Sequence, residues 1–202
     1  MARTAKVLRY VAFTLVVLFA VGGGMFVAGE TFTDPGGWRA VAMTASWAVP
    51  VIALSVFAVR RPAAAGPVLV GVTAIAVLFT LADSAFGIVP RDAWGPVAAV
   101  VVFVVVVALG FLGMHRAELA GLLMVLVGAA QLVATLIARG GVETGAGPGP
   151  GAVLGGSSGV VVLPALVVGL LFVLAGALGH ESVRSRSQHA GRGRSTPAAR
   201  TT

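Results

Sequence analysis

Cysteine and asparagine are absent from this chain, and Lys6 is its single lysine. Without cysteine the chain can form no disulfide, no thiolate metal site and no thiol nucleophile. Charged residues make up only 10% of the sequence, and none lies in the centre of a long apolar run. This scarcity argues against a proton-coupled pump, which usually needs an intramembrane relay of ionisable groups.

Long apolar runs separated by short polar joints make up most of the 202 residues. A membrane-spanning helix needs roughly 20 mostly apolar residues to cross about 30 Å of hydrocarbon. Helices are expected because backbone amides in lipid must be satisfied within the segment. The sequence predicts an all-α polytopic membrane protein, a bundle of six transmembrane helices within residues 1–180. The predicted spans are residues 10–28, 41–59, 66–82, 94–114, 119–138 and 159–179.

The valine-rich run at residues 97–107 resembles a strand by residue preference. A single unpaired strand in lipid would leave backbone groups unsatisfied, at a cost of several kcal/mol for each group. We therefore expect a helix here as well.

Basic residues are concentrated on alternate joints, which predicts the orientation of the chain in the membrane. Lys and Arg are enriched on the cytoplasmic side of membrane proteins, so both termini are predicted to be cytoplasmic. The net charge of +7 is then mainly a topology signal, and no basic, aromatic-interleaved surface indicates nucleic-acid binding. The predicted cytoplasmic residues are Arg3, Lys6, Arg9, Arg60, Arg61, Arg116, Arg184, Arg186, Arg192, Arg194 and Arg200, against Arg39, Arg91 and Arg139 on the other side.

The first run also resembles a secretory signal peptide, since it follows a basic start. It is longer than a typical apolar signal region, and Phe26 stands where a small residue would precede a cleavage site at Ala28. We expect the span to be retained. The preference for Arg over Lys and the heavy use of Ala, Val and Gly indicate a GC-rich genome, and a bacterial plasma membrane is the expected location.

Four carboxylates fall on the predicted outer joints: Glu30, Asp34, Asp83 and Asp92. The segment from Asp34 to Gly37 has the composition of a tight turn, and the Trp and Arg that follow are typical of a membrane interface. An alternative interpretation is that the four carboxylates hold a cation or a polar headgroup, if their oxygens converge. No spacing in the sequence indicates a metal ligand set or a cofactor.

Asp83 and Gln131 are the polar residues that most need a hydrogen-bond or charge partner nearby. Asp83 follows an apolar run at its predicted outer end, where water or Arg91 can satisfy it, and an ion or proton role is the alternative. Gln131 lies within the fifth span, and we expect its amide to make an interhelical polar contact. Hydroxyls in the spans can donate to the backbone of the preceding turn.

Small residues recur where helices could approach each other closely. The predicted packing positions are Gly22, Gly23, Gly24, Gly121, Gly128, Gly169 and Gly176. Residues 60–66 also resemble residues 115–121, each joining an even span to the next odd one. This similarity indicates either a duplicated hairpin or only the common preference of short cytoplasmic turns for Arg.

No enzymatic site is predicted. Residues 156–159 read Gly-Ser-Ser-Gly, which resembles the serine motif of rhomboid intramembrane proteases. Their mechanism needs a histidine within hydrogen-bond reach of the serine. His180 follows Ser158 by 22 residues, about 33 Å along a helix, so the chain supplies no such partner.

Residues 181–202 are predicted to form a disordered, basic cytoplasmic tail, because almost none of them is apolar. Arginines near a membrane surface attract anionic lipid, and the alternative role of this tail is a solvated topology anchor. The predicted lipid contacts are Arg184, Arg186, Arg192 and Arg194.

The E-x-x-x-D-P-G-G-W joint at residues 30–38 and the Arg-Arg-Pro sequence at residues 60–62 resemble small six-span proteins of unassigned function from high-GC actinobacteria. The resemblance implies the fold and no activity. We expect a non-enzymatic accessory or scaffolding protein in the lipid bilayer, packing with itself or with another membrane protein. The alternative is a small-solute or ion transporter that uses the outer acidic joints and Asp83.

Overall fold

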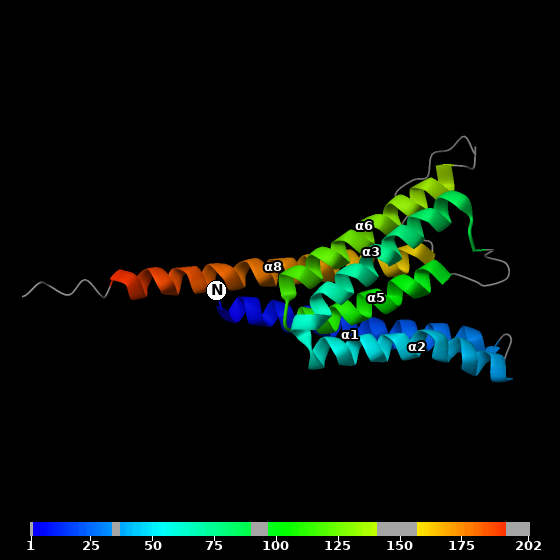
Figure 1. Ribbon diagram of the computed structural model, residues 1–202, viewed down its shortest axis with the longest axis horizontal. Helices are drawn as coiled ribbons and strands as arrows, with labels where there is room; N and C mark the ends of the chain where they lie inside the picture. Colours follow the sequence, from blue (N-terminus) through cyan, green and yellow to red (C-terminus); the bar gives the residue numbers. More distant parts are fainter. Residues whose placement is uncertain (1, 34–36, 90–96, 141–156, 193–202) are drawn as a thin grey trace, which may run out of the picture.

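The computed structural model describes residues 2–33, 37–89, 97–140 and 157–192, and it describes side chains for most of these positions. Every regular element in these ranges is an α-helix, as the sequence predicts. The helices are α1 (Ala2–Thr33), α2 (Gly37–Arg60), α3 (Pro62–Phe86), α5 (Val97–Gly113), α6 (Ala117–Gly140) and α8 (Ser157–Arg192), as Figure 1 shows.

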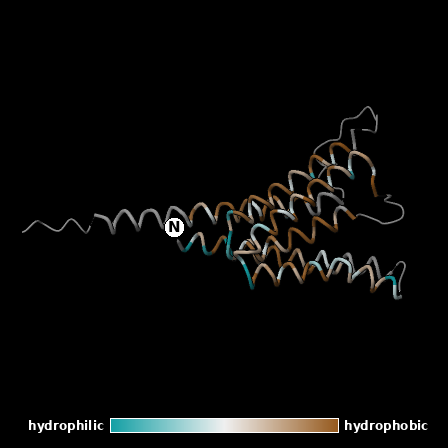
Figure 2. The backbone as a smooth tube through the Cα atoms, in the orientation of Figure 1, coloured by the Kyte–Doolittle hydropathy of each residue, from teal (hydrophilic) through white to brown (hydrophobic). Residues whose placement is uncertain are grey.

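Five of these helices, α1, α2, α3, α6 and α8, are long and apolar enough to cross a membrane. Apolar residues run along the middle of the helices, and hydrophilic residues are found mainly near their ends (Figure 2). The remaining helix, α5, is apolar throughout its 17 described residues. The described residues therefore form a multi-pass helical bundle, and α5 covers residues 97–113 of the predicted span 94–114.

Helix α5 lies at the centre of the bundle and contacts all five other described helices. Its valines at 102, 105, 106 and 107 are nearly completely buried, as are Leu109 and Leu112. A helix that is apolar on every side is stable only when other apolar groups surround it. The helix expected for this valine-rich run is confirmed, but protein surrounds much of it, where the sequence analysis assumed lipid.

One end of the bundle gathers the start of α1, the joint between α2 and α3, and the joint between α5 and α6 (Figure 1). We call this the basic end. Arg9 Nη1 of α1 donates a hydrogen bond of 3.3 Å to the Met114 carbonyl in the second joint. The side chain of Arg116 lies against Gly66, the fifth residue of α3. Side-chain contacts thus tie the two joints and the first helix together.

Helices α6 and α8 form the most extensive helix pair, and glycines allow their close approach. A Cβ atom added to Gly121 would lie 2.6 Å from the Gly169 carbonyl oxygen and 2.6 Å from the Val173 amide nitrogen. Gly128 faces Leu166, and Gly176 faces Glu118. The predicted packing role of these glycines is confirmed. Close backbone contact takes the place of a hydrophobic driving force, which lipid does not provide.

The three consecutive glycines of α1 do not share one role. Gly23 faces the ring of Phe103 and Gly24 faces Trp47, whereas Gly22 has no neighbouring atom within 4 Å of its Cβ position. The prediction that Gly22 packs against another helix is wrong, because its side of α1 lies outside the bundle. The Phe103 ring also packs on Trp47, with centroids 5.9 Å apart.

The end of α8 differs from the predicted boundary at residue 181. The helix continues to Arg192, whereas the sequence analysis places a disordered tail from Glu181 onward. Residues 181–190 contain neither glycine nor proline, so nothing in this stretch interrupts a helix that is already nucleated by the preceding span.

The two similar joints have similar backbone hydrogen bonds. At the first, the Arg61 amide donates to the Phe57 carbonyl and Ala65 donates to Arg61. At the second, Arg116 donates to Leu112 and Ala120 donates to Arg116, which are the equivalent positions of the aligned segments. The repeated hairpins also lie beside each other, with α2 against α5 and α3 against α6. These observations add to the interpretation of a duplicated hairpin.

Replacing Gly121 with Ala should destabilise the bundle. The added methyl group meets backbone atoms of α8, which cannot move independently, and overpacking of this kind costs about 1 to 3 kcal/mol. Gly71 on α3 has open space at its Cβ position, so Gly71→Ala is the matched control and should not lower stability. Thermal unfolding of each variant in detergent measures the difference, and equal melting temperatures for the two variants would contradict this account of the α6–α8 contact.

Candidate functional site

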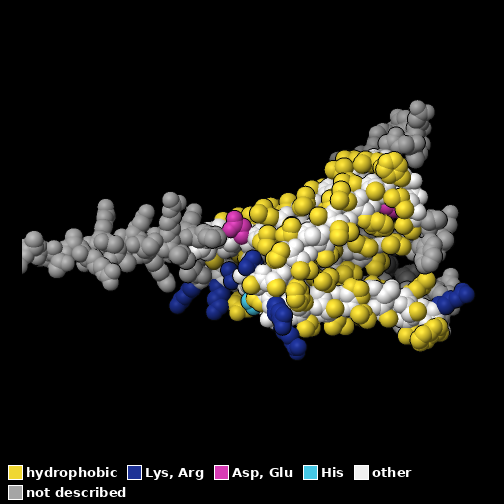
Figure 3. All heavy atoms as spheres, in the orientation of Figure 1, with side chains coloured by type: hydrophobic (Ala, Val, Ile, Leu, Met, Phe, Trp, Pro, Cys, Tyr) yellow, Lys and Arg dark blue, Asp and Glu magenta, His cyan; other side chains and the backbone are white. Residues whose placement is uncertain are grey.

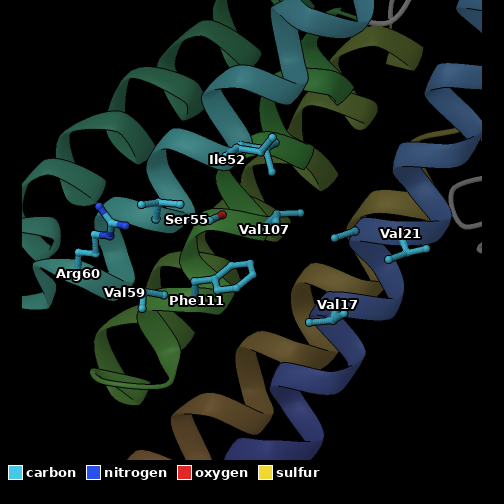
Figure 4. Close-up of a pocket in the computed structure, with 11 residues that line it drawn as sticks. Val17, Val21, Ile52, Ser55, Val59, Arg60, Val107 and Phe111 are labelled. Carbon is cyan, nitrogen blue, oxygen red and sulfur yellow. The ribbon is translucent and has the colours of Figure 1, made fainter.

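A groove of about 550 Å³ runs between α1, α2 and α5 (Figure 4). Val17, Ala20 and Val21 of α1 form one wall, and residues of α2 from Val51 to Arg60 form the other. Val107 and Phe111 of α5 also line it. Several of the lining side chains are exposed on the outside of the bundle, so the groove opens toward the space that lipid occupies in a membrane.

Ser55 is a polar residue in this otherwise mostly apolar lining. Its side chain is 7% exposed, and its hydroxyl has no hydrogen-bond partner among the described residues. Figure 4 shows the hydroxyl oxygen pointing from α2 toward Val107 of α5. A buried hydroxyl without a partner costs free energy, so the site favours a ligand atom that can accept a hydrogen bond from it.

The groove ends at the basic end of the bundle, where Arg60 contributes the last residue of α2. Lys and Arg side chains gather around this end on the face that Figure 3 shows. Arg9 also reaches into the protein here, and its Nε atom is buried without a partner among the described residues. The chemistry of this end suits an anionic group.

Three of the four carboxylates in the predicted outer acidic cluster lie outside the described side chains. Glu30 lies in α1, but its side chain is not described. Asp34 and Asp92 lie outside the described residues. Within the described part of the chain, no three His, Cys, Asp or Glu residues are arranged to hold a metal ion. The convergence of the four carboxylates stays a prediction.

Asp83 is the one member of that cluster with a described side chain, and it binds the backbone that follows α3. Its Oδ1 atom accepts a hydrogen bond of 2.8 Å from the Val89 amide. Its backbone carbonyl accepts another of 2.8 Å from Gly87, which adopts a φ of 60° that favours glycine. The sequence analysis assigned water or Arg91 as the partner, and Arg91 lies outside the described residues. The contact with Val89 has no sequence signature, because it depends on the turn at Gly87.

The hydroxyls within the helices divide into two groups. Thr135 donates to the Gln131 carbonyl at 2.8 Å, and Ser84 and Ser46 donate to carbonyls three residues earlier, as predicted. Thr73 and Thr80 of α3 are buried without hydrogen-bond partners among the described residues, so the prediction fails for them. Both lie on the buried face of α3 that also carries Asp83.

Gln131 is 8% exposed, in agreement with the expectation that it faces protein. The structure assigns no described partner to its amide, so the interhelical hydrogen bond stays a prediction. The predicted lipid contacts of the tail also stay untested: Arg184, Arg186 and Arg192 lie in α8 without described side chains, and Arg194 lies outside the described residues.

No protein-family model, curated protein or solved structure matches this chain. Functional interpretation therefore depends on the groove, the basic end and the buried polar face of α3.

Replacing Asp83 with Ala should lower the free energy of unfolding by about 1.5 to 3 kcal/mol, the value of a hydrogen bond to a charged group. Asp83→Asn keeps an oxygen that can accept from the Val89 amide, so it should lose less. Thermal unfolding in detergent compares the two variants. An Asn variant as unstable as the Ala variant would show that the charge, and not the acceptor, is the stabilising feature.

Proposed function

We propose that this protein is a non-enzymatic accessory or scaffolding component of a membrane complex. The observation that supports this proposal most strongly is the contrast between two exposed helix faces. On α2 the small residues Ala42, Ala45, Ser46 and Ala53 share one exposed face, on which Val49 is the large side chain between them, and other large apolar residues are exposed elsewhere on this helix. On α6 the exposed positions are mostly large apolar residues, such as Leu122, Leu126, Val133 and Leu136.

The physical reason is that small residues allow two helix backbones to approach closely in a membrane, as Gly121 and Gly169 do within this bundle. Large aliphatic side chains are as well accommodated by lipid as by protein. The α2 face is therefore better suited than the α6 face to a partner helix, either from another membrane protein or from a second copy of the chain.

The packing of the bundle gives further support. In the most apolar stretches of α1 and α2 about 11% of the residues are buried, against 50% in α6. The centre of the bundle is filled by apolar side chains of α5, α6 and α8, including Leu109, Met124 and Phe172. A rigid core with one little-buried side fits a protein that presents a surface to a partner.

The proposal includes a location and an orientation. We place the protein in a bacterial plasma membrane with the basic end in the cytoplasm. The basic residues of the described joints gather at this end, and membrane proteins carry more Lys and Arg on their cytoplasmic side. Both termini are then cytoplasmic.

Affinity purification of a C-terminally tagged protein in mild detergent, followed by mass spectrometry, tests the proposal. A stoichiometric membrane protein or second copy should be recovered with the wild type and lost with Ala45→Trp, since the bulky side chain prevents close approach at the α2 face. Ala129→Trp places the same side chain on the exposed face of α6 and is the matched control. Recovery of no partner, or equal loss with both variants, would contradict the proposal.

A small-solute or ion transporter is the second candidate. The observation that favours it is the buried face of α3, where Thr73 and Thr80 have hydroxyls without described partners and Asp83 carries a buried carboxylate. Ionisable groups at membrane depth often mark ion pathways.

Flux assays in liposomes distinguish this candidate. An ion-dependent flux that uses Asp83 should be abolished by Asp83→Asn, which removes the charge and keeps the hydrogen-bond acceptor. Flux that persists in the Asn variant would exclude Asp83 from the pathway, and the absence of flux in the wild type would remove the transporter candidate.

A further inference from the structure

We propose that the groove between α1, α2 and α5 binds one anionic phospholipid, with an acyl chain between α1 and α2 and the phosphate at Arg60. This site is distinct from the predicted lipid contacts of the tail. It also goes beyond the scaffolding function, because a lipid can occupy the groove whether or not a partner protein binds elsewhere.

The walls of the groove fit a hydrocarbon chain. Its lining is almost entirely Val, Ile, Ala and Phe side chains, and its volume of about 550 Å³ is in the range of small-molecule sites. Val21 and Ile52, on opposite walls, are 57% and 62% exposed, so a chain can enter from the bilayer without the helices separating.

The same lining disfavours a partner helix in the groove. Close helix packing in membranes uses small residues, whereas this groove is walled by branched residues such as Val17, Val51 and Val56. A flexible acyl chain adapts to such a surface, because it needs no backbone contact.

The charge at the groove's end selects the headgroup. Arg60 lines the groove at its basic end, and Arg61 follows it in the joint. Basic pockets between transmembrane helices on the cytoplasmic side bind anionic headgroups, whose phosphate matches the planar donors of a guanidinium group. A zwitterionic lipid has a weaker attraction, since its own cation opposes that of the arginine.

Ser55 supplies a polar position between these two regions. It precedes Arg60 by five residues, which is about 7.5 Å along α2, toward the hydrocarbon. In a phospholipid the ester carbonyls lie between the phosphate and the acyl chains. Rotation about the χ1 bond of Ser55 would let its unpartnered hydroxyl donate to such a carbonyl. The groove therefore presents a cation at its end and an apolar surface along its length, and Ser55 after rotation would add a donor between them.

Native mass spectrometry of the purified protein in detergent tests the site, with added phosphatidylglycerol or phosphatidylcholine of identical acyl chains as probes. We expect one phosphatidylglycerol to bind more tightly than phosphatidylcholine. Arg60→Gln should weaken phosphatidylglycerol binding about fivefold, the effect of one arginine near an anionic lipid. Arg61→Gln removes a neighbouring exposed charge that does not line the groove, so it should change the affinity much less.

Equal losses with Arg60→Gln and Arg61→Gln would show a general surface attraction and overturn the site, as would equal affinity for the two lipids. The proposed binding of the acyl chain has a separate test that leaves Arg60 unchanged. Ala20→Phe fills the groove and should reduce binding of the single lipid, whereas Ala74→Phe on the exposed face of α3 should not. Unchanged binding in a folded Ala20→Phe variant, or a second copy of the chain bound in place of the lipid, would overturn it.

Discussion

Backbone amides and carbonyls have no water to bind in a hydrocarbon layer, and this constraint underlies the whole architecture. It explains why the valine-rich residues of α5 form a helix in spite of their preference for strands. It also allows α5 to lie at the centre in contact with five other helices, because a helix satisfies its backbone internally. The remaining helices then supply the apolar surface that faces lipid.

Once every segment is a helix, the distance between helix axes decides which parts of the bundle are rigid. Glycines bring α6 and α8 into backbone contact, whereas branched side chains keep parts of α1 and α2 apart. The first arrangement makes a closed core. The second leaves a groove that ends at Arg60 and holds a buried hydroxyl at Ser55. The proposed lipid site and the proposed partner face are thus both found on the side of the bundle where packing is least tight.

Polar groups inside the bundle have roles that depend on local geometry more than on residue type. Asp83 holds the chain after α3 through the Val89 amide, because Gly87 turns the backbone toward it. Thr135 makes the expected hydrogen bond to the preceding turn, whereas Thr73 and Thr80 do not make this bond. Residues of the same type therefore differ in whether they retain hydrogen-bonding capacity for another molecule.

The sequence by itself determined the helical class, the approximate position of each apolar segment and the packing role of Gly121 and Gly169, because these follow from hydropathy, segment length and side-chain size. The basic residues of the sequence also lie mainly on the joints that meet at one end of the bundle. The tertiary structure alone decided that α5 is central and that Gly22 lies outside the bundle. The groove likewise joins residues from three helices, and hydropathy carries no information about which faces of those helices meet.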